Sequence, residues 1–139
     1  MRSRRDHLLR ALAARLAYRG SVLLFLALWS GGQAVRLAWP DPAVLGSGTY
    51  LYLASLAPLG VLAAPWAVCA VLCAVQAWTV VDWPAFALTA GVLVAWAVVY
   101  LAGGLRGAIP GAYWACIVQV TVAGLILRLS RWPDPPRGV

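Results

Sequence analysis

Apolar residues occur in four long runs, separated by short polar or proline-rich breaks. The longest covers residues 42–81, which carry no charge between Asp41 and Asp82. Three further apolar runs cover residues 20–35, 84–105 and 107–127. About 20 apolar residues cross a bilayer as a helix, whereas a soluble fold of 139 residues has no core that could bury such runs. The pattern predicts an all-α polytopic membrane protein, a bundle of transmembrane helices.

The breaks between the runs predict four spans. They cover residues 20–35, 56–80, 84–102 and 108–127. Arg19 and Arg36 flank the first span, and we expect both to reach the headgroups by snorkelling outward along their own stems. Asp82 precedes a proline and is the predicted N-cap of the third span. A glycine-rich, charged break at residues 103–107 ends that span.

The start of the second span is ambiguous. We interpret residues 43–55 as an interfacial or re-entrant approach to it. Pro58 then falls in the first turn, where proline is tolerated, and Pro65 kinks the interior. The alternative is a break at residues 58–60 with a half-span before it. A break is possible there because the residue that precedes a proline disfavours helical geometry.

Arginine distribution predicts the orientation. Nine of the eleven arginines lie at the two ends of the chain, and only Arg36 and Arg106 lie on the other side of the predicted membrane. By the positive-inside rule, both termini are predicted to be cytoplasmic. The chain then divides into a basic segment (1–19), a four-span domain (20–127) and a basic, proline-rich tail (128–139). The candidates for contact with anionic lipid headgroups are Arg4, Arg5, Arg10, Arg15, Arg19, Arg128 and Arg131.

The basic N-terminal segment does not form a separated amphipathic face, because Arg15 and Arg19 share the side of the helix that carries Leu8 and Leu12. We expect it to continue as a helix into the first span. A cleavable signal peptide is the alternative, since Gly32-Gln33-Ala34 offers small residues for cleavage, and it would leave three spans.

Composition agrees with a membrane protein and excludes other classes. The chain is 63% hydrophobic with a mean hydropathy of +0.83, above the roughly 45–50% apolar usage of soluble domains. All eleven basic residues are arginine, and lysine and asparagine are absent, which is typical of a GC-rich genome. The net charge of +7 does not predict a nucleic-acid partner, because the charges cluster beside the spans and no polar domain carries a recognition surface.

Residues that carry chemistry are few. Cys69 and Cys73 share one helical face, but metal binding needs three or four converging ligands, so no metal and no cofactor is predicted. No carboxylate pair or Ser–His–Asp set occurs, so we do not expect an enzyme. The polar Gln119 is the best-buried amide by position. Small residues at four-residue spacing instead predict close helix packing. The packing candidates are Cys69, Cys73, Ala87, Gly91, Ala95, Gly111, Ala115 and Gln119.

Both ends of the chain resemble a known group. The sequence at residues 16–25, the Arg106-Gly107 pair before the last span, and residues 131–136 after it are similar to small multi-span membrane proteins of actinobacterial phages. The resemblance implies a phage protein of the host cytoplasmic membrane that associates with copies of itself, with holin-like lysis its most concrete role. A docking or structural subunit without pore activity, for example in superinfection exclusion, is the alternative. A small transporter is disfavoured, because no ionisable residue is expected inside the spans.

Overall fold

The computed structural model describes residues 19–79 and 82–131. These residues form five α-helices, in the order α2 (Ser21–Ala38), α3 (Gly48–Leu56), α4 (Leu59–Gln76), α5 (Trp83–Leu105) and α6 (Ala112–Ser130). All except α3 are long and apolar enough to cross a membrane. The prediction of an all-α fold with four candidate spans is confirmed. The cytoplasmic location of both termini stays a prediction.

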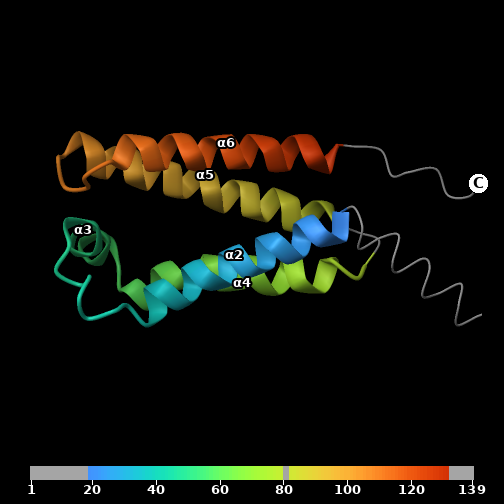
Figure 1. Ribbon diagram of the computed structural model, residues 1–139, viewed down its shortest axis with the longest axis horizontal. Helices are drawn as coiled ribbons and strands as arrows, with labels where there is room; N and C mark the ends of the chain where they lie inside the picture. Colours follow the sequence, from blue (N-terminus) through green and yellow to red (C-terminus); the bar gives the residue numbers. More distant parts are fainter. Residues whose placement is uncertain (1–18, 80–81, 132–139) are drawn as a thin grey trace, which may run out of the picture.

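The four long helices form two antiparallel pairs. In Figure 1, α2 packs along α4 and α5 packs along α6, and the pairs meet mainly where α4 contacts α5. The start of α2 and the end of α6 lie at the same end of the bundle (Figure 1), here called the Arg19 end because Arg19 connects them. The opposite end, which carries α3 and the α5–α6 turn, is called the α3 end.

Observed helix lengths explain why the boundaries differ from those predicted. The first span was predicted to end at residue 35, but α2 continues to Ala38. Its 18 residues rise about 27 Å, closer to the ~30 Å hydrocarbon core than the predicted 16 residues would come. α6 begins at Ala112, later than the predicted residue 108, because Gly111 before it takes a left-handed conformation with φ of 70°. Such a backbone geometry suits glycine and stops the helix from extending backward.

The approach to the second span contains a short helix of its own. α3 has nine residues, too few to span, and lies beyond the ends of α2 and α4, beside the α5–α6 turn (Figure 1). The chain breaks at Ala57, which is fully extended, and α4 begins after Pro58. The predicted start at residue 56 is therefore wrong by three residues. The reason is that a residue before proline avoids helical geometry, whereas Pro65 lies inside α4 without ending it.

Contacts between the helices form one main core. Its largest fully buried side chains include Leu23 on α2, Cys69 on α4 and Phe86 on α5. α3 is held separately, because Tyr52 packs on Ile109 and Ala112 at the start of α6. Both sets of contacts are interhelical, so the pairs are joined by side-chain packing at the core and by α3 at one end.

Candidate functional site

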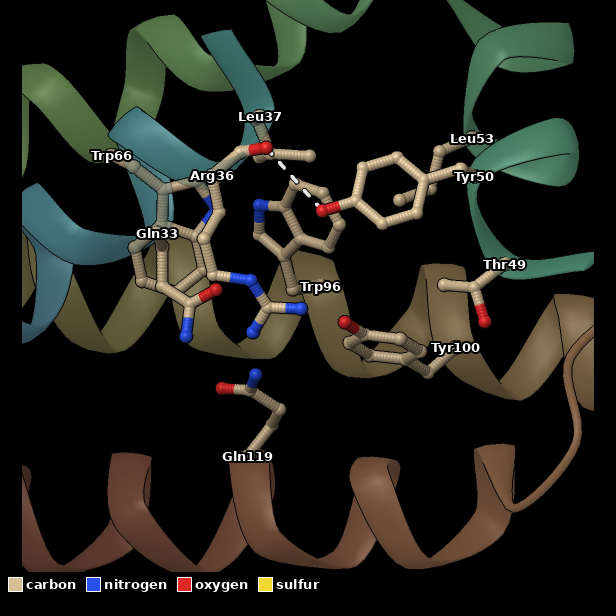
Figure 2. Close-up of a pocket in the computed structure, with 10 residues that line it drawn as sticks. All are labelled: Gln33, Arg36, Leu37, Thr49, Tyr50, Leu53, Trp66, Trp96, Tyr100 and Gln119. Carbon is tan, nitrogen blue, oxygen red and sulfur yellow. Dashed lines mark hydrogen bonds between the residues drawn. The ribbon is translucent and has the colours of Figure 1, made fainter. Parts of the chain in front are cut away.

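A polar and aromatic cleft lies between the two helix pairs, toward the α3 end. Four helices and the beginning of α3 contribute its walls. The lining residues are Gln33, Arg36, Leu37, Thr49, Tyr50, Leu53, Trp66, Trp96, Tyr100 and Gln119 (Figure 2). The volume open to the centres of water molecules is ≈ 40 Å³. A single water needs about 10–15 Å³ by this measure, so the cleft has room for a few water-sized groups. We call it the Arg36 cleft.

The Arg36 guanidinium faces the cleft between the helix pairs, and the residue as a whole is still exposed. The sequence predicted that it would turn outward to the headgroups, and the structure corrects this: Figure 2 shows its guanidinium between Gln33, Tyr100 and Gln119. The physical reason is its position in the last turn of α2. Helical side chains tilt toward the N-terminus of their own helix, which from this end of α2 is toward the middle of the bundle. A charged residue thus faces the space between the spans, where none was expected when a transporter was disfavoured.

Aromatic rings form the floor of the Arg36 cleft. The ring centroids of Trp66 and Trp96 are 5.8 Å apart, and those of Trp96 and Tyr100 are 5.9 Å apart. Tilted pairs at this separation are favourable beyond their burial, and both tryptophans are almost fully buried. Tyr50 on α3 donates from its hydroxyl to the backbone carbonyl of Arg36, at 3.3 Å. The ring contacts therefore join α4 to α5 at the floor, and α3 is tied to the end of α2 beside it.

An ion pair joins three helices at the Arg19 end. Arg19 Nη1 donates to both carboxylate oxygens of Asp82, at 3.1 and 3.3 Å, and Nη2 donates to the carbonyl oxygen of Ser130 at 2.9 Å. Arg19 thus connects the start of α2 to the start of α5 and the end of α6. Contact of this arginine with lipid headgroups stays a prediction, but its guanidinium already has protein partners.

The predicted cap of α5 needs a correction. Asp82 occupies the N-cap position, but its side chain makes no capping hydrogen bond, because Arg19 binds the carboxylate. Gln76 at the end of α4 replaces it: its Oε1 accepts from the backbone N–H of Ala85 at 2.9 Å. The first N–H groups of a helix have no intrahelical hydrogen-bond partner. The contact from Gln76 therefore gives one of these groups in α5 a partner and also joins α4 to α5.

The two free cysteines of α4 lie in the packed core. Cys69 and Cys73 are fully buried, and the Cys73 thiol lies 3.3 Å from the hydroxyl of Thr89 on α5. Cys116 is half-buried on α6. Within residues 19–79 and 82–131, no three potential ligands gather that could hold a metal ion.

The predicted packing row of α5 does not pack inside the chain. Ala87, Gly91 and Ala95 are exposed, and no atom lies within 4 Å of a Cβ added at Gly91. The face of α5 that enters the core carries other residues, among them Phe86, Ala90 and Leu93. This outward row remains available to a neighbour from outside the chain.

The remaining candidates lie on α6 or near the ends. Gly111 is a correction, since it precedes α6 and forms the turn instead of packing against a helix. Ala115 is half-buried, and Gln119 lines the Arg36 cleft. Arg128 and Arg131 are exposed at the Arg19 end. Four further headgroup candidates lie outside the described residues: Arg4, Arg5, Arg10 and Arg15.

Sequence reasoning missed the Arg36 cleft. One signal was present, because Gln33 and Arg36 are three residues apart and so share a face of α2. No comparable signal marks Trp66, Trp96 and Gln119 as their neighbours, since these residues come together only when α4, α5 and α6 pack.

A scan against protein-family models and searches of curated proteins and of solved structures found no match to this chain. Its function must therefore be argued from the four candidate spans, the Arg36 cleft and the outward row of α5.

Proposed function

We propose that this small integral membrane protein acts in the bacterial cytoplasmic membrane by associating with copies of itself, as a holin-like factor encoded by a phage. The observation that carries the proposal is the outward row Ala87, Gly91 and Ala95 on α5. In lipid, helices associate by close packing, and rows of small residues allow their backbones to approach. A second copy could place one of its helices on this row without displacing any side chain near Gly91.

Polar surface between the helix pairs supports a role in membrane damage. A conducting path between copies needs groups that water can wet, and the spans contain few of them. The Arg36 cleft brings several such groups together, on Gln33, Arg36 and Gln119. We expect the path to form only at high density of the protein, so that damage is delayed and then abrupt.

The test is induced expression in bacteria, with membrane potential and optical density recorded over time. Gly91→Leu should delay or abolish the collapse of the potential, because a bulky side chain keeps a neighbouring helix away from the row. Gly124→Leu on α6 is the matched control, since this glycine is also exposed with nothing within 4 Å but lies outside the row. The control should behave like the unchanged chain.

Two results would contradict the proposal. If strong expression leaves membrane potential and growth intact, pore formation is wrong, and the alternative of a docking or structural subunit becomes the leading interpretation. If both leucine variants shift the timing equally, the effect comes from added bulk in the bilayer and the row on α5 has no special part in association. Cross-linking in membranes, which reports oligomer size directly, separates loss of association from loss of expression.

A further inference from the structure

We propose that the Arg36 cleft is a binding site for a phosphate-bearing anion, a property that does not depend on whether copies of the chain associate. The first observation that favours an anion is the charge of the residues lining the cleft. Arg36 is the only charged residue among the ten that line the cleft, and no carboxylate lies with it. The neighbouring amides and hydroxyls of Gln33, Gln119, Tyr100 and Thr49 can all donate hydrogen bonds. A cation surrounded by neutral donors selects an anion.

The second step is that Arg36 has no acidic partner in the described chain. The two carboxylates there are engaged elsewhere: Asp82 binds Arg19 at the opposite end, and Asp41 accepts from the backbone N–H of Ala43. Within residues 19–79 and 82–131, no hydrogen bond or ion pair involves the Arg36 guanidinium. Ionisable residues of membrane spans normally pair with one another or with backbone carbonyls. Arg36 is still exposed on the cleft, so a ligand can reach its guanidinium. An external anion would supply the missing partner.

Shape and size favour phosphate. The planar guanidinium presents parallel N–H groups that match two oxygens of a phosphate or a carboxylate. Figure 2 shows amides or hydroxyls on three sides of it, from Gln33, Tyr100 and Gln119, so donors remain for further oxygens. The ≈ 40 Å³ open to water centres corresponds to about three to four water-sized groups, which suits the four oxygens of one phosphate. Trp66 and Trp96, both almost fully buried, line the cleft beside these donors.

Two sources can provide this chemistry: the headgroup of an anionic phospholipid, or a free phosphate in solution. Arg36 lies two residues before the end of α2, about 3 Å along the helix axis, so its backbone is close to the depth at which lipid phosphates begin. α2 and α6, which supply Arg36 and Gln119, have no extensive packing contact with each other. A lipid headgroup could therefore reach the cleft from the side, with its acyl chains left outside the bundle.

The test uses the full chain, purified in a neutral detergent without phospholipid, and two probes in separate arms: phosphatidylglycerol and inorganic phosphate. Native mass spectrometry measures retained lipid, and tryptophan fluorescence follows both titrations, since Trp66 and Trp96 line the cleft. Arg36→Gln should weaken binding at least tenfold. Arg106→Gln is the matched control, because it removes the other arginine of the α3 end from an exposed turn outside the cleft, and it should stay within twofold. Arg36→Lys should lie between them, since the charge remains but the two-pronged contact is lost.

The outcomes separate the sources. Binding of phosphatidylglycerol alone, lost in Arg36→Gln, identifies the lipid headgroup; binding of inorganic phosphate with the same loss identifies a soluble anion. Circular dichroism and thermal unfolding establish whether each variant is folded. If Arg36→Gln does not fold, Gln119→Leu tests the cleft instead, because it keeps the charge of Arg36 but removes a hydrogen-bond donor. Binding of neither probe, or equal losses in the Arg36 and Arg106 variants, overturns the proposal.

Discussion

The ion pair at the Arg19 end offers the sharpest test of how this bundle is held together. Arg19 joins α2, α5 and α6 through its hydrogen bonds, and its partner Asp82 is almost fully buried. The perturbation is a double-mutant cycle made of Arg19→Ala, Asp82→Ala and the double variant. Asp82→Ala removes no helix cap, because the carboxylate makes no capping hydrogen bond. The cycle therefore isolates the pair itself.

The exposure of the two side chains sets the magnitude. The Arg19 side chain is 23% exposed and that of Asp82 is 9% exposed. Exposed pairs contribute about 0–1 kcal/mol, and removing one partner of a buried pair costs about 3–5 kcal/mol. For this intermediate case we expect a coupling free energy of about 1–3 kcal/mol. Arg19→Ala should cost more than Asp82→Ala, because it leaves the buried carboxylate without its cation, whereas Arg19 without Asp82 still donates to Ser130.

The assay is reversible unfolding in mixed micelles with increasing denaturing detergent, followed by tryptophan fluorescence. Arg131→Ala is the control, since this arginine is exposed at the same end, and it should change the free energy of unfolding by less than about 0.5 kcal/mol. High salt should leave the coupling largely intact, because a buried pair is weakly screened. A coupling below about 0.5 kcal/mol, or equal costs of the two single variants, would refute the reasoning.

Three further predictions address α3, the core and the orientation. Gly48→Ala should destabilise the docking of α3 by about 1–3 kcal/mol, because a Cβ there would lie 2.5 Å from the backbone oxygen of Ala108. Limited proteolysis at the α3 end measures this loss, and unchanged protection from cleavage would contradict the prediction. Ser30→Ala should be neutral or stabilising by about 1 kcal/mol, because the fully buried Ser30 hydroxyl has no hydrogen-bond partner in the described chain. The same unfolding in mixed micelles measures the change in free energy, and a loss of stability would contradict the prediction. Reporter fusions after residues 19, 45, 82, 106 and 139 should alternate in, out, in, out, in, because arginines concentrate at the ends of the chain; a periplasmic C-terminus would require an odd number of spans.

The sequence by itself determined the solvent, the fold class and the approximate spans. Long uncharged runs need hydrocarbon around them, and lipid leaves helices as the form in which such runs satisfy their backbone groups. These arguments need only local composition, so they succeeded for all four spans. They failed at the ends of helices, such as Ala57 and Gly111, where a single backbone conformation decides the boundary.

Only the tertiary structure decided which faces meet and where the polar side chains gather. Nearly every face of these helices is apolar, so periodicity could not tell the core from the lipid side, and the small row of α5 proved to point outward. Arg36 and Gln119 are 83 residues apart in the chain and share a cleft only because the two helix pairs diverge at the α3 end. Arg19 and Asp82 likewise lie far apart in the sequence and meet because antiparallel packing brings the start of α2 beside the start of α5. Contacts of this kind depend on side-chain packing between distant segments, about which local hydropathy carries no information.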